Sequence, residues 1–265
     1  MSSNHSYIHG AETTEQERLS ILNSLTNKAF IEFIEPQKNS VILEIGSGLG
    51  ILANEVANRT PNGKVYGIEL LKPQLKKSPR NISNLHFVNG DVHNIPIKYN
   101  SLNIVYGRYI LEHLSQPELV LSNIFDVLKP GGKLFLQENA ILTIQFYPEC
   151  PKFEHAWKQF ANLQSQLGGD AMIGIKLYQL LKQASFVNIE ASFAPEIHYS
   201  EKETFIPWID NLIGNLESAK NNLIKFNLVS NSEFQDAIQE LNEFKINQNA
   251  STYFYWNRIV GQKPA

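Results

Sequence analysis

One glycine-rich stretch with acidic residues around it carries most of the chemistry available to this sequence. The stretch Gly46-Ser47-Gly48-Leu49-Gly50 follows an apolar run and precedes a helical pattern. Glycine lacks a Cβ and tolerates positive φ, so such a turn can bring bare backbone and a helix N-terminus against a ligand. Its spacing is G-x-G-x-G, whereas the dinucleotide fingerprint G-x-G-x-x-G requires glycine at position 51, where Ile51 stands.

Four carboxylates lie at or near the expected carboxyl ends of strands: Glu44, Glu69, Asp91 and Glu138. Glu69 lies 23 residues after Gly46, close to the offset of about 20 residues at which an acid meets a ribose diol. In open α/β sheets ligands bind at these strand ends. A cluster of acids there favours a cationic ligand over a polyphosphate.

The elements that must position these residues alternate between strand and helix. Residues 41–45, 64–69 and 85–89 read as strands, and the turn cluster Thr60-Pro61-Asn62-Gly63 separates the first helix from the second strand. A helix over about residues 117–128 leads through Lys129-Pro130-Gly131-Gly132 into a strand at 133–138. The apolar runs are continuous, as expected of parallel strands covered by helices on both faces.

The combined pattern resembles the class I S-adenosylmethionine-dependent methyltransferases over residues 41–139. The matching pieces are residues 44–50, Glu69, Gly90-Asp91-Val92 with Ile95-Pro96-Ile97, Asn103-Ile104-Val105-Tyr106, and residues 128–133. Asn103 departs from the family, which often has aspartate there. A narrower resemblance is to bacterial small-molecule methyltransferases of the UbiE-like, methyltransferase-domain type. It rests on Tyr7-Ile8-His9-Gly10, Glu17-Arg18-Leu19, residues 107–114, Gln137-Glu138 and Gly168-Gly169-Asp170.

The resemblance implies an α/β fold, namely a Rossmann-like three-layer sandwich. Its sheet has seven mostly parallel strands with an antiparallel last strand, here the β-rich tail at 251–262, plus helical cap insertions at 140–170 and 195–250. We expect residues 1–40 to form an N-terminal helical lid and residues 41–139 the S-adenosylmethionine-binding core. Residues 140–265 then supply the cap insertions and complete the sheet.

The same resemblance implies that the chain binds S-adenosyl-L-methionine and releases S-adenosyl-L-homocysteine. The residues that it assigns to the cofactor are Tyr7, Glu44, Gly46, Ser47, Gly48, Glu69, Leu70, Asp91, Val92, Gly107 and Arg108. Glu69 would accept the ribose hydroxyls and Asp91 the adenine amino group. Glu44 would fix the turn or the ammonium, or be structural; Arg108 would border the sulfur or form an ion pair. Gly50 would allow helix and strand to approach closely.

Methyl transfer needs placement of the acceptor and exclusion of water, because the sulfonium is already an activated leaving group. A base is needed only if the acceptor must lose a proton. Glu138 and His113 are the candidates, against a hydrogen bond to the sheet edge for Glu138 and a structural role for His113. If Glu138 is the base, Glu138→Gln should lower turnover and leave the affinity for the cofactor near normal. Aromatic candidates for substrate contact, or simply for the core, are Tyr147, Trp157, His198, Trp208 and Tyr255.

Composition limits the classes of molecule that the protein is expected to bind. The 265 residues carry 23 basic and 26 acidic side chains, a net charge of −3, with no Lys/Arg stripe, so no nucleic-acid partner is expected. Cys150 is the single cysteine, and no His/Asp/Glu cluster has metal spacing, so we predict no metal. No apolar run approaches the roughly 20 residues of a membrane span. We expect a cytoplasmic protein with a small-molecule substrate and no membrane partner; a homo-oligomer is left open.

Three readings follow. The first is a methyltransferase acting on a small, largely apolar or aromatic metabolite, such as a natural-product intermediate, at carbon, nitrogen or oxygen. The second is an NAD(P)-dependent oxidoreductase, against which Ile51 weighs. The third is a catalytically silent S-adenosylmethionine-binding protein that acts through a partner.

Overall fold

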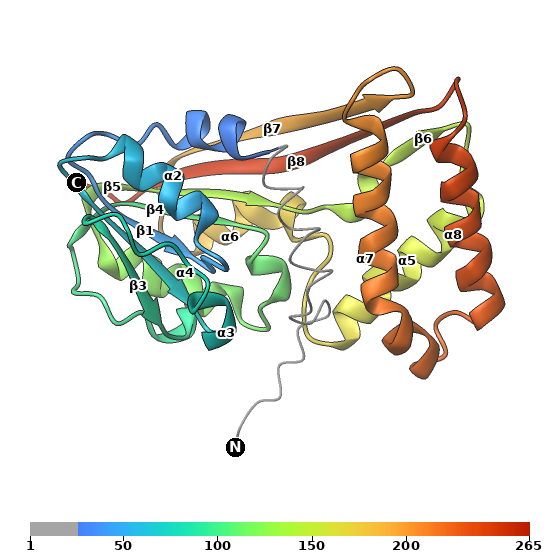
Figure 1. Cartoon of the computed structure of the whole chain (residues 1–265). Coiled ribbons are helices and arrows are strands. Elements are labelled where there is room, and N and C mark those ends of the chain that lie inside the picture. Colours follow the sequence, from blue (N-terminus) through green and yellow to red (C-terminus); the bar gives the residue numbers. More distant parts are fainter. Residues whose placement is uncertain (1–25) are drawn as a thin grey trace. The chain divides into compact units, whose positions relative to one another are not determined.

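The computed structural model describes residues 26–265, which fall into two compact units (Figure 1). The core unit consists of Thr26–Asn139, Ile173–Phe193 and Asn257–Ala265. The described part of the insertion unit consists of Ala140–Met172 and Ala194–Trp256. The sequence predicts insertions at 140–170 and 195–250. The predicted lid residues Tyr7 and His9 lie outside the described residues.

The core unit is built on a mostly parallel sheet, as the sequence predicts. Its hydrogen-bonded order is β3-β2-β1-β4-β5, followed by β8, which runs antiparallel to β5. The parallel strands are β1 (Val41–Ile45), β2 (Lys64–Glu69), β3 (Leu85–Asn89), β4 (Leu102–Arg108) and β5 (Leu128–Glu138). The register pairs Glu69 with Asn89 and Arg108 with Gln137, so the strand ends that carry the candidate residues lie at one edge.

Helices cover both faces of this sheet and complete the expected three layers (Figure 1). The helix over residues 26–34 and α2 (Ile51–Arg59) bury their apolar side chains in one cluster, which includes Phe30 and Val56. The helices α4 (Pro117–Val127) and α6 (Leu177–Gln183) contribute to the other. In α4 the buried Val120, Leu121, Ile124 and Val127 recur at helical spacing, which gives the helix one apolar face.

Short elements shape the loops of the core unit. They are α3 (Lys72–Leu75) and the 3-10 turns η1 (Val92–Asn94), η2 (Leu111–His113) and η4 (Ile173–Lys176). Two of these turns, η1 and η2, directly follow the carboxyl ends of β3 and β4, so they lie in the loops where the sequence places ligand-binding residues.

In the insertion unit, α5 (Pro151–Gln166), α7 (Phe205–Lys225) and α8 (Asn231–Lys245) pack against one another. Ser230 starts α8 with a capping box, because its hydroxyl accepts from the Glu233 N–H while the Glu233 carboxylate accepts from the Ser230 N–H. The unit also contains η3 (Ile141–Thr143) and β6 (Gln145–Tyr147), which pairs antiparallel with the first residues of β8 (Ser251–Gln262).

The strand β7 (Val187–Tyr199) pairs with β8 and brings the described residues to eight strands. The sequence predicts seven; the additional strand is the three-residue β6, which is too short to show an alternating pattern. Across residues 26–265, none of the helices combines the length and apolar character that a membrane crossing requires.

Lys263, just after β8, caps the C-terminus of α4. Its ammonium donates to the carbonyl oxygens of Phe125 and Leu128 at 2.7 and 2.9 Å. A cation at the negative end of a helix stabilises the helix, and hydrogen bonds from a charged donor stabilise the folded state. We therefore expect Lys263→Met to lower the free energy of unfolding by about 1–2 kcal/mol in urea titrations. The control is Lys64→Met, an exposed lysine of the same unit, and an equal loss in both variants would contradict this role.

Candidate functional site

The glycine turn connects β1 to α2, and contacts on two sides require its glycines. Gly46 and Gly50 have φ values of 65° and 73°. A Cβ on Gly46 would lie 2.2 Å from Cδ1 of Ile110, and one on Gly50 would lie 2.3 Å from Cζ of Phe87 in β3. The positive φ therefore disfavours larger residues at both positions, and at Gly50 the Phe87 ring leaves no space for a Cβ. Gly50 thus has the close-packing environment expected of it.

Glu69, at the end of β2, is tied directly to this turn. Its Oε2 accepts from the Gly48 N–H at 3.0 Å, and its Oε1 accepts from the Leu71 N–H at 2.8 Å. The side chain is only partly buried. Each carboxylate oxygen can accept more than one hydrogen bond, so a ribose diol can still bind this group. Gly48 and Glu69 therefore form one hydrogen-bonded unit. The neighbouring Leu70 is 57% exposed.

Glu44 is a buried carboxyl group with an unpartnered oxygen. It is 6% exposed, and Oε2 has no hydrogen-bond partner within the described part of the chain. Burial raises the pKa of Glu44 to about 8, although the positive charge of Arg108 opposes the shift. The Tyr106 hydroxyl lies close enough to lower this pKa without reaching hydrogen-bond geometry. The buried Ser47 hydroxyl likewise finds no partner among residues 26–265. Such groups suit a ligand that brings a cation and donors.

Asp91 lies after β3 and holds its own turn. Its Oδ1 accepts from the His93 N–H at 2.9 Å and lies 2.7 Å from Nδ1 of the same residue. The side chain is 52% exposed, and the adjacent Val92 is buried. A site for the adenine amino group at Asp91 therefore stays a prediction.

Gly107 and Arg108 end β4. A Cβ on Gly107 would lie 2.6 Å from Cγ1 of Ile45, so the two strands approach closely there. The Arg108 guanidinium donates to Oγ1 of Thr26 and Oδ1 of Asn27 at 2.8 and 2.7 Å. It also lies 5.2 Å from the centre of the Phe30 ring. Arg108 thus anchors the start of the helix at 26–34, a role closer to the structural alternative than to contact with sulfur.

The candidate bases are Glu138, the last residue of β5, and His113, in the loop after β4. Glu138 is 0% exposed, and its carboxyl group accepts from the backbone N–H groups of Ile110, Leu111 and Glu112. Burial and the charge of Glu112 raise the pKa of Glu138 to about 8, against the effect of these hydrogen bonds. His113 ends η2, with Nε2 3.7 Å from the Glu112 carboxylate. Both residues stay predictions as bases, and the geometry of Glu138 favours the hydrogen-bonded alternative.

The five aromatic candidates for substrate contact all belong to the insertion unit. Trp157 is 5% exposed, stacks between Phe153 and Phe160, and donates its indole N–H to the Ile141 carbonyl. His198 and Trp208 are 1% and 2% exposed and stack on each other. Tyr147 is 70% exposed, and Tyr255 is half-buried. Three of the five therefore belong to the core of this unit, and their contact with substrate stays untested.

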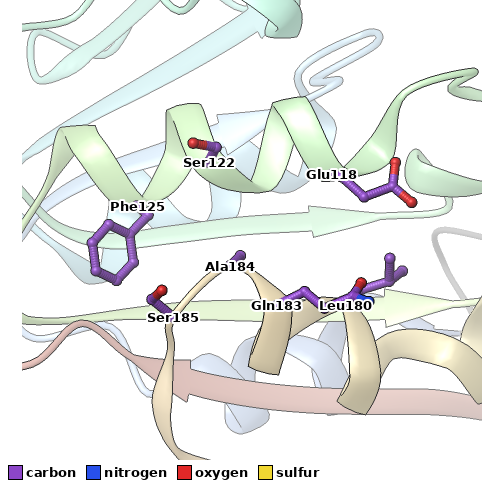
Figure 2. A pocket seen from close by; sticks show the side chains of 7 residues that line it. All are labelled: Glu118, Ser122, Phe125, Leu180, Gln183, Ala184 and Ser185. Carbon is purple, nitrogen blue, oxygen red and sulfur yellow. The ribbon is translucent and has the colours of Figure 1, made fainter.

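A pocket on the core unit lies apart from the predicted residues. It is formed between α4 and the end of α6, and Figure 2 shows the side chains that line it. The lining residues are Glu118, Ser122, Phe125, Leu180, Gln183, Ala184 and Ser185. Its walls hold one carboxylate and small polar groups, without the glycine turn or the strand-end acids.

The sequence assigned no role to three residues that hold the site together, although two of them, Ile110 and Gln137, lie in the motifs of the resemblance. Ile110 contacts the turn glycine, Asn27 binds Arg108, and Gln137 binds both Tyr109 and Arg258. The stretch 107–114 was singled out by resemblance, but no periodicity marks Ile110 as the residue that faces Gly46. Asn27 is 81 residues from Arg108 in sequence, so only the fold brings them together.

Comparison with known proteins finds relatives of this chain. Residues 43–136 match the methyltransferase domain family. Demethylmenaquinone methyltransferase from Lactococcus lactis is 28% identical over 153 residues, covering 54% of this chain and 58% of that protein. The chain spans about half the length of the curated relatives it matches, with coverages of 51%, 46% and 58% for three of them.

Solved structures give the same fold. A phosphoethanolamine N-methyltransferase 2 from Haemonchus contortus, in complex with S-adenosylhomocysteine, aligns with a TM-score of 0.56 at 18% identity. The match covers 94% of this chain and 53% of that one. The cyclase SpnF aligns with a TM-score of 0.54 at 16% identity, covering 98% of this chain and 86% of that one.

The glycine turn and the acid at the end of β2 thus lie within the residues that match the family, and the antiparallel strand β8 follows outside them. This supports the resemblance drawn from the motifs: residues 43–136 are similar to the methyltransferase domain family, and the chain has the Rossmann-like fold of solved methyltransferases.

Proposed function

We propose that this protein transfers a methyl group from S-adenosylmethionine to a small, largely apolar or aromatic metabolite. The observation that carries the proposal is the joint placement of Gly48 and Glu69, which the hydrogen bond of 3.0 Å holds together. The Glu69 carboxylate of this pair can accept hydrogen bonds from ribose hydroxyls. It lies beside a glycine turn whose backbone has no side chains to block a ligand. A nucleoside with a cationic sulfur fits the acids nearby better than a polyphosphate does.

The residues present fit this cofactor. Glu69 would bind the ribose hydroxyls while it keeps its hydrogen bonds to Gly48 and Leu71. Glu44 and Ser47 would meet the amino-acid end, where their unpartnered oxygens could accept from the ammonium. Asp91 would lie toward the adenine, next to the buried Val92.

The bound cofactor supplies an activated methyl group. The protein then needs to place the acceptor in line with the methyl group and to exclude water. Arg108 would contribute by fixing the helix at residues 26–34, which lies within the segment 1–40 expected to form the lid. His113 is the more accessible of the two candidate bases, because Glu138 is fully buried and already accepts three N–H groups.

The acceptor class is supported by two observations. In the insertion unit Tyr147 is exposed and Tyr255 is half-buried, so both aromatic rings are accessible, and one relative is named a demethylmenaquinone methyltransferase. The acceptor atom and any place in natural-product biosynthesis stay open. The protein would work as a small-molecule enzyme in the cytoplasm.

A silent cofactor-binding protein is the main alternative. The structural neighbour SpnF is a cyclase, so a methyltransferase-like fold can carry another reaction. Cofactor binding supports both readings, and release of S-adenosylhomocysteine in the presence of an acceptor separates them. An oxidoreductase instead requires affinity for NAD.

We expect S-adenosylhomocysteine to stabilise the protein and NAD to have no effect. At a hundred times its Kd, a ligand stabilises the folded state by about 2.7 kcal/mol, which differential scanning fluorimetry detects as a rise in Tm. Glu69→Ala should remove most of this rise, because it removes the ribose acceptor. Glu217→Ala, an exposed acid on α7, is the matched control. A rise with NAD alone would refute the proposed cofactor.

We expect the affinity for S-adenosylmethionine to increase with pH up to about 8, the pKa of Glu44 in the free protein. Below this pH the carboxyl group is protonated, and binding of a cation releases the proton. Affinity should therefore rise by up to about tenfold per pH unit. Calorimetry at pH 7 in phosphate and in Tris measures the released proton, and Glu44→Gln should abolish this release. Subtracting the proton release of Glu44→Gln from that of the unaltered protein removes the contribution of the ligand's own ammonium. Equal proton release in both would contradict the role of Glu44.

A further inference from the structure

The loop after β4 contains a strained residue. Tyr109 has a φ of 54°, in the left-handed region that bulky side chains rarely adopt. Such a conformation is strained and persists only where its surroundings enforce it. The residues that enforce it come from the end of β5.

Gln137 holds Tyr109 from two sides. The Tyr109 N–H donates to the Gln137 carbonyl at 3.0 Å, and the Gln137 amide donates to the Tyr109 hydroxyl at 2.6 Å. Arg258 in turn donates to Oε1 of Gln137 at 2.7 Å. Gln137 is 0% exposed, so water cannot replace these bonds.

Glu138 holds the next three residues. Its Oε1 accepts from the N–H groups of Ile110 and Leu111, each at 3.1 Å, and its Oε2 accepts from the Glu112 N–H at 3.4 Å. These donors stand at the start of η2, where backbone N–H groups lack partners within the helix. The buried carboxyl group thus acts as an internal cap for the loop.

The loop in turn contacts the glycine turn. Cδ1 of Ile110 lies 2.2 Å from the position that a Cβ of Gly46 would occupy, and its Cγ2 lies 3.1 Å from the corresponding position on Gly107. The Ile110 side chain therefore covers both glycines at the ends of β1 and β4. A shift of its backbone would leave the turn without this support.

We propose that Glu138 is a positioning residue that fixes Ile110 against Gly46 and Gly107 and thereby holds the glycine turn in the shape that binds the cofactor. This role rests on the proposed function and assigns Glu138 a task other than that of a base. A base must reach the proton that it removes, whereas this carboxyl group is sealed from solvent and engaged by three backbone donors.

The experiment measures the affinity for S-adenosylhomocysteine by calorimetry, because this readout needs no acceptor. Glu138→Ala removes the acceptor of all three N–H groups, and we expect affinity to fall by about tenfold or more. Glu138→Gln keeps an amide oxygen for the Ile110 and Leu111 donors, so affinity should stay within about threefold. Ile110→Ala should reproduce the loss, and adding it to Glu138→Ala should lower affinity little further, because both act through one contact.

The control for general destabilisation is Thr60→Ala, a buried hydroxyl that binds the Val56 carbonyl at the far end of α2. It should lower Tm without changing affinity. Amide hydrogen exchange without ligand should accelerate at Ile110 and Leu111 in Glu138→Ala and stay slow in Glu138→Gln. If Glu138→Ala fails to fold, unchanged affinity in Ile110→Ala, or a loss of affinity in Glu138→Gln, still overturns the positioning role.

Unchanged affinity in Glu138→Ala or Ile110→Ala would overturn the positioning role and leave the proposed function standing. So would an equal loss in Glu138→Gln and Glu138→Ala. Normal affinity with turnover lowered more than about a hundredfold in Glu138→Gln would identify a base instead. Absence of binding by the unaltered chain would overturn the proposed function itself.

Discussion

The hydrogen bond from the Gly48 N–H to the Glu69 carboxylate is the interaction on which the site depends. It joins the turn after β1 to the end of β2 and sets the distance between the two. The parallel register makes this possible, because Ile45 pairs with Ile68 and the two strands end together. The same bond orients the carboxylate before any ligand arrives, so less ordering remains to be done on binding.

Acids at the ends of other strands also accept hydrogen bonds from backbone N–H groups of the loops. Glu138 accepts three N–H groups from the loop after β4, and Asp91 accepts one from its own turn. Loops at the carboxyl edge of a parallel sheet leave backbone donors without partners, and buried donors need an acceptor. Carboxyl groups are strong acceptors, so these acids organise the loops as well as provide charge.

These acids differ in solvent exposure, and their roles differ with it. Glu69 is partly exposed and keeps capacity for a ligand, whereas Glu138 is sealed and serves the loop. Glu44 is buried with one oxygen unpartnered within the described residues, an arrangement that costs stability unless a ligand compensates for it. The cost of these buried groups is consistent with a site organised for function rather than for stability.

The sequence by itself determined the alternating strands and helices of the core, the glycine turn and the acid at the end of β2, because each has a local pattern of fixed spacing. The antiparallel direction of the final strand came only from the family resemblance. The tertiary structure alone decided that Ile110 covers Gly46, that Arg108 binds Thr26 and Asn27, and that Glu138 faces the loop backbone. It also placed Trp157, His198 and Trp208 in a core, and it added β6 to the strands. These facts depend on which side chains converge from distant parts of the chain, and hydrophobic periodicity carries no record of such pairings.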